Sequence, residues 1–303
     1  MLKEKGVEMK IKKLLFLTVF FCTGVLTQAQ VKLSFNPAKG ETYSYRFDIE
    51  QAGTQTFMGQ EIPINTTIGM LLEMNIKEKN KDEVRVNYTY KEIVMTVSIP
   101  MMNIHYDSKN PVEKLSEQEQ LIAQIFNSLI GKTMNVVISS NGSVKSISGF
   151  KAIMEEMQKN MDSSVSQQMA GTLLQSFNDE AMKNMFEQSF RFYPNSAVKI
   201  SDSWNSDFSY VVMGMNNDIK NTYTLKSIKN NVAALDVVSI LTLKPNAGME
   251  GEISGEQKGE ISLNVQTGML VNSNTTQNIK GKLNIQGSEM WMDLVSKTTV
   301  SLE

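Results

Sequence analysis

Residues 83–99 read EVRVNYTYKEIVMTVSI, a run of alternating apolar and polar side chains that predicts one long β-strand. The apolar side chains stand on even positions as far as Tyr90 and on odd positions from Ile93 onward. Because successive side chains of a strand point to opposite faces, this change of parity requires a bulge or a bend, which we expect near Lys91-Glu92. At ~3.3 Å per residue the strand would reach roughly 55 Å. We therefore expect a long, twisted and curled sheet.

The same alternation continues on both sides of this strand. Upstream, residues 43–49 and 62–76 show a period of two. Downstream, the two short segments 134–139 and 144–147 flank a turn at Asn141-Gly142. The first half of the chain is therefore predicted to be mainly β-sheet.

One short helix is expected within this first half. Ser116 and Glu119 have the spacing of a capping box, and the apolar residues that follow recur at helical spacing as far as Ile130. Gly131 is placed to end that helix. Between the long strand and the helix, we expect a loop from Ile104 to Asn110.

A second β-tract begins at Trp204 and continues to the end of the chain. Residues 232–243 are more uniformly apolar than the other strands, which indicates a central strand, and Thr267-Gly268 is a turn. The two tracts, 30–148 and 194–303, share an order of strands and glycine turns. A duplicated β-unit and two unrelated meanders both account for that likeness. We predict one β-rich domain over residues 30–303, with a helical insert at 149–193.

The insert is rich in methionine, and its apolar side chains recur at helical spacing. It predicts two or three short helices that cover the open face of the sheet. The methionine stripe either packs as ordinary core or lines a space for an apolar ligand, since methionine side chains adapt to varied shapes. The candidate ligand-lining residues are Met154, Met157, Met161, Met169, Leu173, Met182 and Met185.

The first 29 residues have the layout of a secretory signal peptide. Lysines precede an apolar run from Leu14 to Leu26, and Thr27-Gln28-Ala29 precedes the predicted cleavage site. The apolar run is shorter than the ~20 residues that span a bilayer. We therefore predict a soluble protein that is secreted or periplasmic, not an integral membrane protein.

Composition and motifs argue against several classes of function. The formal net charge is −2 without a basic cluster, which argues against a nucleic-acid partner. The sole cysteine, Cys22, lies in the signal peptide, and with His105 as the only histidine a zinc site of nitrogen and sulfur ligands cannot be assembled. No nucleophile elbow surrounds His105. We predict no catalytic residues, no metal, no cofactor and no enzyme activity.

Three short motifs resemble an uncharacterised family of secreted bacterial proteins, classed only as a domain of unknown function. They are Gly40-Glu41-Thr42-Tyr43-Ser44-Tyr45, Asn141-Gly142-Ser143-Val144 and Val198-Lys199-Ile200-Ser201-Asp202-Ser203-Trp204. Ser201 stands where such proteins commonly have glycine. The resemblance implies no chemistry. In layout the chain is also similar to the lipoprotein-carrier and LppX type of half-open β-barrel, which implies long strands around a few helices.

Taken together, these patterns predict an α+β fold. A long curled antiparallel sheet, as a half-barrel or a sandwich, is expected to be covered by the central helical block. The leading functional hypothesis is non-enzymatic binding of an apolar or amphiphilic ligand, such as a lipid, in the cell envelope. The alternative is a structural or protein-interaction module of the envelope without a small-molecule ligand.

Overall fold

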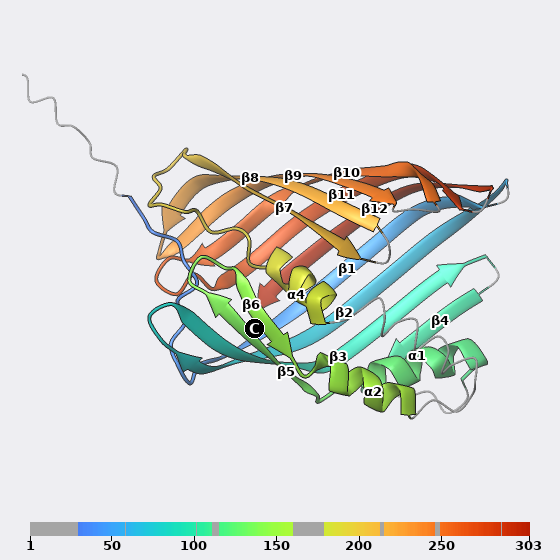
Figure 1. The fold of residues 1–303 in the computed structure, drawn as a ribbon, viewed down its shortest axis with the longest axis horizontal. Coiled ribbons are helices and arrows are strands. Elements are labelled where there is room, and N and C mark those ends of the chain that lie inside the picture. Colours follow the sequence, from blue (N-terminus) through green and yellow to red (C-terminus); the bar gives the residue numbers. More distant parts are fainter. Residues whose placement is uncertain are drawn as a thin grey trace, which may run out of the picture.

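The computed structural model describes residues 30–57, 59–100, 102–110, 115–159, 179–212, 215–245, 249–285 and 287–303. Within these ranges the chain forms a twelve-stranded antiparallel sheet and three short α-helices (Figure 1). None of these helices is long and apolar enough to cross a membrane. The predicted signal peptide, residues 1–29, lies outside the described residues.

The first half of the chain is a meander of antiparallel strands. Its strands are β1 (Thr42–Phe57), β2 (Gln60–Lys79), β3 (Glu83–Ile99), β4 (Met102–Asp107), β5 (Thr133–Ser139) and β6 (Val144–Ser148). The long strand β3 pairs with β2 along one side. Its other side pairs with β5 over the first half of its length and with β4 over the second.

The second half is another meander, and it continues the same sheet. Its strands are β7 (Ser203–Val212), β8 (Met215–Lys229), β9 (Val232–Pro245), β10 (Met249–Asn264), β11 (Leu270–Ile285) and β12 (Ser288–Leu302). The last strand pairs with the first, with Leu302 opposite Tyr45. The strand order is therefore β6-β5-β3-β2-β1-β12-β11-β10-β9-β8-β7. That the two meanders are copies of one duplicated unit stays a prediction.

The predicted long strand and its bulge are confirmed. β3 covers 17 residues, and its register with β2 shifts where Leu71 pairs with Glu92 and Leu72 with Tyr90. Lys91 is thus the extra residue of the bulge. The bulge keeps both apolar sets on the buried face, since Val86 and Ile93 are each at most 1% exposed.

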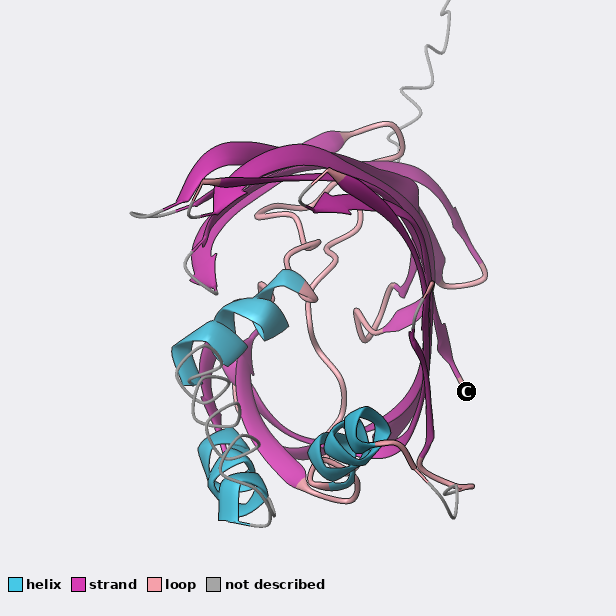
Figure 2. Ribbon diagram, turned by 90° about the vertical axis from the view of Figure 1, so that its right-hand side faces the viewer, coloured by secondary structure: helices cyan, strands magenta, loops and turns pink. Residues whose placement is uncertain are grey.

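The sheet curls into an incomplete ring (Figure 2). Its two edge strands are β6 and β7, which do not pair with each other. Helix α4 (Asp179–Gln188) contacts both edge strands, so it covers the gap between them (Figure 1).

The predicted α+β class with a central helical block is wrong. The described helices α1 (Glu117–Asn127), α2 (Phe150–Lys159) and α4 have only ten or eleven residues each, and strands make up most of the chain. The reason is that the second β-tract extends the first sheet, so the sheet encloses its own concave face. No helical layer is needed to cover that face.

The local features of the first half have mixed outcomes. The capping box is confirmed, because Ser116 accepts a hydrogen bond from the Glu119 backbone N–H and the Glu119 carboxylate accepts one from the Ser116 N–H. The predicted loop from Ile104 to Asn110 is wrong for residues 104–107. Pairing with β3 makes this segment the strand β4, where His105 Nδ1 lies 3.1 Å from Thr96 Oγ1.

The hydrophobic core fills one end of the ring, where an N-terminal segment crosses the concave side. Leu33 and Phe35 of this segment are each 1% exposed. The backbone N–H of Phe35 donates to Ser140 O, and that of Asn36 donates to Thr267 O, both at 2.8 Å. The segment therefore ties the β5–β6 turn to the β10–β11 turn and closes this end of the ring.

Candidate ligand-binding site

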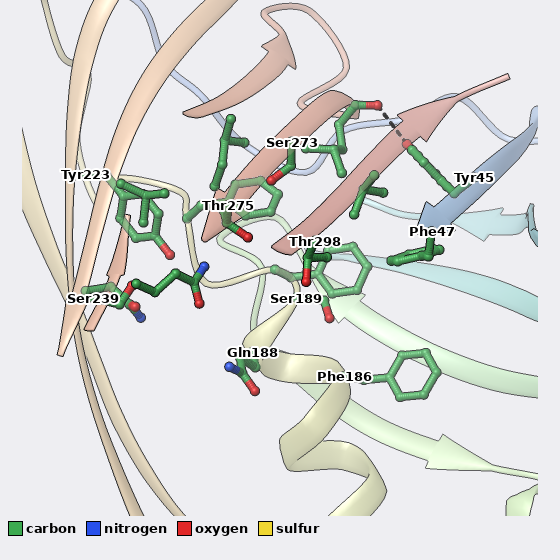
Figure 3. Close-up of a pocket in the computed structure, with 18 of the residues that line it drawn as sticks. Tyr45, Phe47, Phe186, Gln188, Ser189, Tyr223, Ser239, Ser273, Thr275 and Thr298 are labelled. Atoms are coloured by element: carbon green, nitrogen blue, oxygen red, sulfur yellow. Dashed lines mark hydrogen bonds between the residues drawn. The ribbon is translucent and has the colours of Figure 1, made fainter. Parts of the chain in front are cut away.

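A cavity of about 340 Å³ lies on the concave face of the sheet, beside the C-terminal end of α4 (Figure 3). Its lining comes from the N-terminal segment, β1–β3, β8–β12, the turn before β11, the end of α4 and the segment that follows α4. Strands far apart in the sequence contribute because the β1–β12 pairing joins the two meanders next to the cavity. The cavity is therefore a product of the whole sheet.

Aromatic side chains form the wall nearest the core. The lining aromatics are Phe35, Tyr45, Phe47, Tyr88, Phe186, Phe190, Phe192, Tyr193 and Tyr223. Two of their hydroxyl groups are fixed by main-chain acceptors: Tyr45 Oη donates to Leu270 O at 3.0 Å, and Tyr193 Oη donates to Gly268 O at 2.8 Å. The buried hydroxyl of Tyr88 has no hydrogen-bonding partner among the described residues.

A row of uncharged polar side chains crosses the cavity lining at one level. We call it the polar row; it consists of Asn221, Ser239, Gln257 and Gln277, on the successive strands β8, β9, β10 and β11. Each of the four lies directly opposite the next in the strand register. The row continues beyond the cavity, because Gln277 lies opposite Ser296 and Ser296 opposite Gln51.

Most of the polar row is available for new hydrogen bonds. Asn221 Nδ2 donates to Ser206 O at 2.9 Å. The side chains of Ser239, Gln257 and Gln277 form no hydrogen bond with the other described residues. Because water or a ligand must satisfy such groups, the row is a set of donors and acceptors that faces the cavity.

Apolar side chains lie next to the polar row on its open side, away from the core. We call this set the apolar row; it consists of Ile219, Leu241, Ile279 and Leu294. In the register, Ile219 lies opposite Leu241, and Ile279 lies opposite Leu294. On the core side of the polar row stand Tyr223, Val237, Thr275 and Thr298. A band of amides and hydroxyls is thus bordered by hydrocarbon on its open side and by a mixed surface on its core side.

No side chain that lines the cavity, among the residues the structure describes, is charged at neutral pH. Burial raises the pKa of the lining tyrosines Tyr45, Tyr88, Tyr193 and Tyr223, which keeps their phenols neutral. Glu187 and Arg191 flank the lining residues along the chain but form an ion pair with each other. The Arg191 guanidinium carbon lies 5.4 Å from the centre of the Phe208 ring.

Of the predicted ligand-lining residues, the four that the structure describes do not line this cavity. Met154, Met157 and Met182 are 5%, 1% and 7% exposed and pack into the core, while Met185 is 40% exposed. Met161, Met169 and Leu173 lie outside the described residues. The structure thus brings together mainly strand residues that the sequence did not single out. The lining groups from the predicted insert come from its C-terminal part, at Phe186, Gln188, Ser189, Phe190, Phe192 and Tyr193.

A family model described as a family of unknown function (DUF6263) matches residues 81–270, well over half of the chain. Comparison with the curated proteins gave no match.

Among solved structures, a lipovitellin chain, from a study of lipid–protein interactions in lipovitellin, is 11% identical with a TM-score of 0.47. The comparison covers 88% of this chain and 25% of that one, so the present chain spans a quarter of the lipovitellin chain. The COG4313 outer membrane channel from Pseudomonas putida F1 is 6% identical, with 89% and 98% covered and a TM-score of 0.22. OmpF from Salmonella typhi is 7% identical, with 86% and 98% covered and a TM-score of 0.25.

Proposed function

We propose that this chain, which belongs to the DUF6263 family, binds an apolar or amphiphilic molecule such as a lipid on the concave face of its sheet. One observation carries the proposal: a cavity of about 340 Å³ whose lining is mainly aromatic and aliphatic, with a few convergent polar groups. Small-molecule sites generally have ~300–1,000 Å³ and this kind of lining. The ligand would take the place of water along the hydrocarbon surface.

The proposed role is binding without catalysis. General acid–base catalysis uses groups that exchange protons near neutral pH, most often histidine or a carboxylate. The described lining contains serines, threonines, amides and tyrosines, and burial raises the pKa of these tyrosines further from neutrality. This composition supports retention of a ligand. In keeping with the N-terminal signal pattern, we place the protein in the cell envelope or outside the cell.

A matched pair of variants tests the proposal. Leu241 lines the cavity, whereas its neighbour Ile240 is 47% exposed on the opposite face of β9. Leu241→Trp should fill part of the cavity and weaken binding of an uncharged, environment-sensitive naphthalene dye by about tenfold, a loss of roughly 1.4 kcal/mol. Ile240→Trp should leave the dye affinity unchanged, and thermal melting checks that both variants fold.

The parent protein must bind the dye saturably for the proposal to stand. An absence of saturable binding, or an equal loss of affinity in both variants, would contradict it. Native mass spectrometry of protein purified from its own host supplies a second readout. A co-purified amphiphile supports the proposed role, and protein that is consistently empty favours the interaction module instead.

A further inference from the structure

We infer that the ligand of this cavity is an electrically neutral amphiphile, whose hydroxyl, ester or amide groups bind the polar row while its hydrocarbon part lies on the apolar surface beside it. The inference rests on the proposed function and adds the chemical class of the ligand. Three features of the described residues support it: the alignment of the row, the absence of charge in the lining, and the apolar surface next to the row.

The alignment of the polar row matches a polar group of some length. Neighbouring strands lie ~4.8 Å apart, so four side chains on consecutive strands extend over roughly 14 Å. Gln257 and Gln277 each offer an amide carbonyl and an amide NH2, so donors and acceptors are both present. Such a row suits a glycerol ester or an amide-linked head group better than a single terminal hydroxyl.

The lack of charge disfavours ionic head groups. A carboxylate, phosphate or quaternary amine in this position would lose its hydration without gaining an ion-pair partner from the lining. Arg191 is the nearby cation along the chain, but Glu187 already neutralises it and its guanidinium lies over Phe208. An uncharged head group avoids this cost and still satisfies the amides.

The surface next to the polar row fixes where the hydrocarbon lies. On the open side, the apolar row presents Ile219 and Leu241 to the cavity. On the core side, the ring of Tyr223 is accompanied by the hydroxyls of Thr275 and Thr298, so this side is mixed. The apolar surface that borders the row therefore lies on its open side, and the ligand's hydrocarbon extends from the row along that side.

Competition between ligands of equal chain length tests the inference. The dye is displaced with monolauroylglycerol, with dodecanoate and with dodecyltrimethylammonium, each below its micelle concentration. We expect monolauroylglycerol to act at a concentration at least about tenfold lower than either ion. Equal or stronger displacement by an ion, in a parent that binds the dye, overturns the neutral-ligand inference alone. A parent that does not bind the dye overturns the proposed function with it.

Substitutions at the polar row give a second, independent readout. Gln277→Leu should weaken monolauroylglycerol about fivefold, as expected for the loss of one hydrogen bond. Asn278→Leu, on the exposed face of the same strand, should have no effect. Gln277→Lys should reverse the preference in favour of dodecanoate. Thr298→Val, a nearly isosteric change that also removes a hydroxyl from the lining, replaces Gln277→Leu if that variant does not fold. Unchanged head-group preference in the folded variants contradicts the assignment.

Discussion

Two glycines in equivalent hairpin turns hold the closed end of the ring together, and both contact Tyr193. Gly142 has a φ of +86° and Gly268 a φ of +70°, values that favour glycine. A Cβ on Gly268 would lie 1.9 Å from Ser34 O, and one on Gly142 would lie 2.8 Å from the Tyr193 ring. At the scale of single residues, the absence of these two side chains lets the crossing segments reach the core.

Gly268→Ala should therefore destabilise the protein by about 3 kcal/mol or more, because left-handed strain adds to a collision with the backbone of Ser34. Gly287 is the control: its φ is +83°, but a Cβ there would meet nothing within 4 Å. Gly287→Ala should cost only about 1 kcal/mol. Urea unfolding compares the two, and equal losses would contradict close packing at the closed end.

Tyrosine burial predicts how stability depends on pH. Burial raises the pKa of all eight tyrosines, most strongly at Tyr88 and Tyr193, above the ordinary value of 10. The folded state binds the tyrosine protons more tightly than the unfolded state does. Their contribution to the free energy of unfolding is therefore fully present below pH 10 and is lost as the pH rises above it.

We accordingly expect most tyrosinate absorbance to appear together with loss of the β-sheet circular dichroism signal in an alkaline titration. Urea unfolding at a series of pH values should show stability falling above pH 10, the ordinary pKa of tyrosine. Tyrosines that ionise well before the sheet unfolds would contradict the burial described for Tyr88 and Tyr193.

At the scale of secondary structure, local patterns gave the strands and the short helices α2 and α4, but they failed for the predicted covering of the sheet by a helical block. The parity switch in β3 requires only a bulge at Lys91, so it was predictable from period alone. The capping box at Ser116 is equally local. The segment 104–107 was misassigned because its strand character comes from pairing with β3, which local sequence does not report.

The methionine stripe illustrates the same limit, and it can be tested. Met157, on α2, is 1% exposed, so Met157→Ala should cost about 2–5 kcal/mol through the cavity that it leaves. Met185, on α4, is 40% exposed, and Met185→Ala should change stability by no more than about 0.5 kcal/mol. Urea unfolding measures both. Similar values for the two variants would show that the stripe is not divided between core and surface.

At the scale of the whole molecule, the candidate site depends on register, which the sequence does not reveal. Asn221, Ser239 and Gln257 stand among inward-facing positions of their strands, whereas Gln277 follows the polar inward positions Ser273 and Thr275 on β11. Only the pairing of four strands brings these four polar side chains to one level. The sequence could therefore indicate a curled sheet, but not the row of amides across it.

The pairing of the first strand with the last has a kinetic consequence. Arg46 on β1 contacts Glu303, the residue after β12, although 257 residues separate them in the chain. Until β12 has been synthesised, one edge of β1 and one edge of β11 remain unpaired. Unpaired strand edges favour association between chains. Joining them is also a long-range step, and such steps are slow.

The two tryptophans report on the two stages of refolding. Trp204 lies in the β7–β8 hairpin, and Trp291 lies on β12. The Trp291→Phe variant keeps only Trp204, and the Trp204→Phe variant keeps only Trp291. During refolding, we expect Trp204 to reach its native fluorescence before Trp291 does. Identical rates for both would mean that the sheet forms in one step. A slow Trp291 would mark β12 as the strand whose arrival ends the chain's exposure to aggregation.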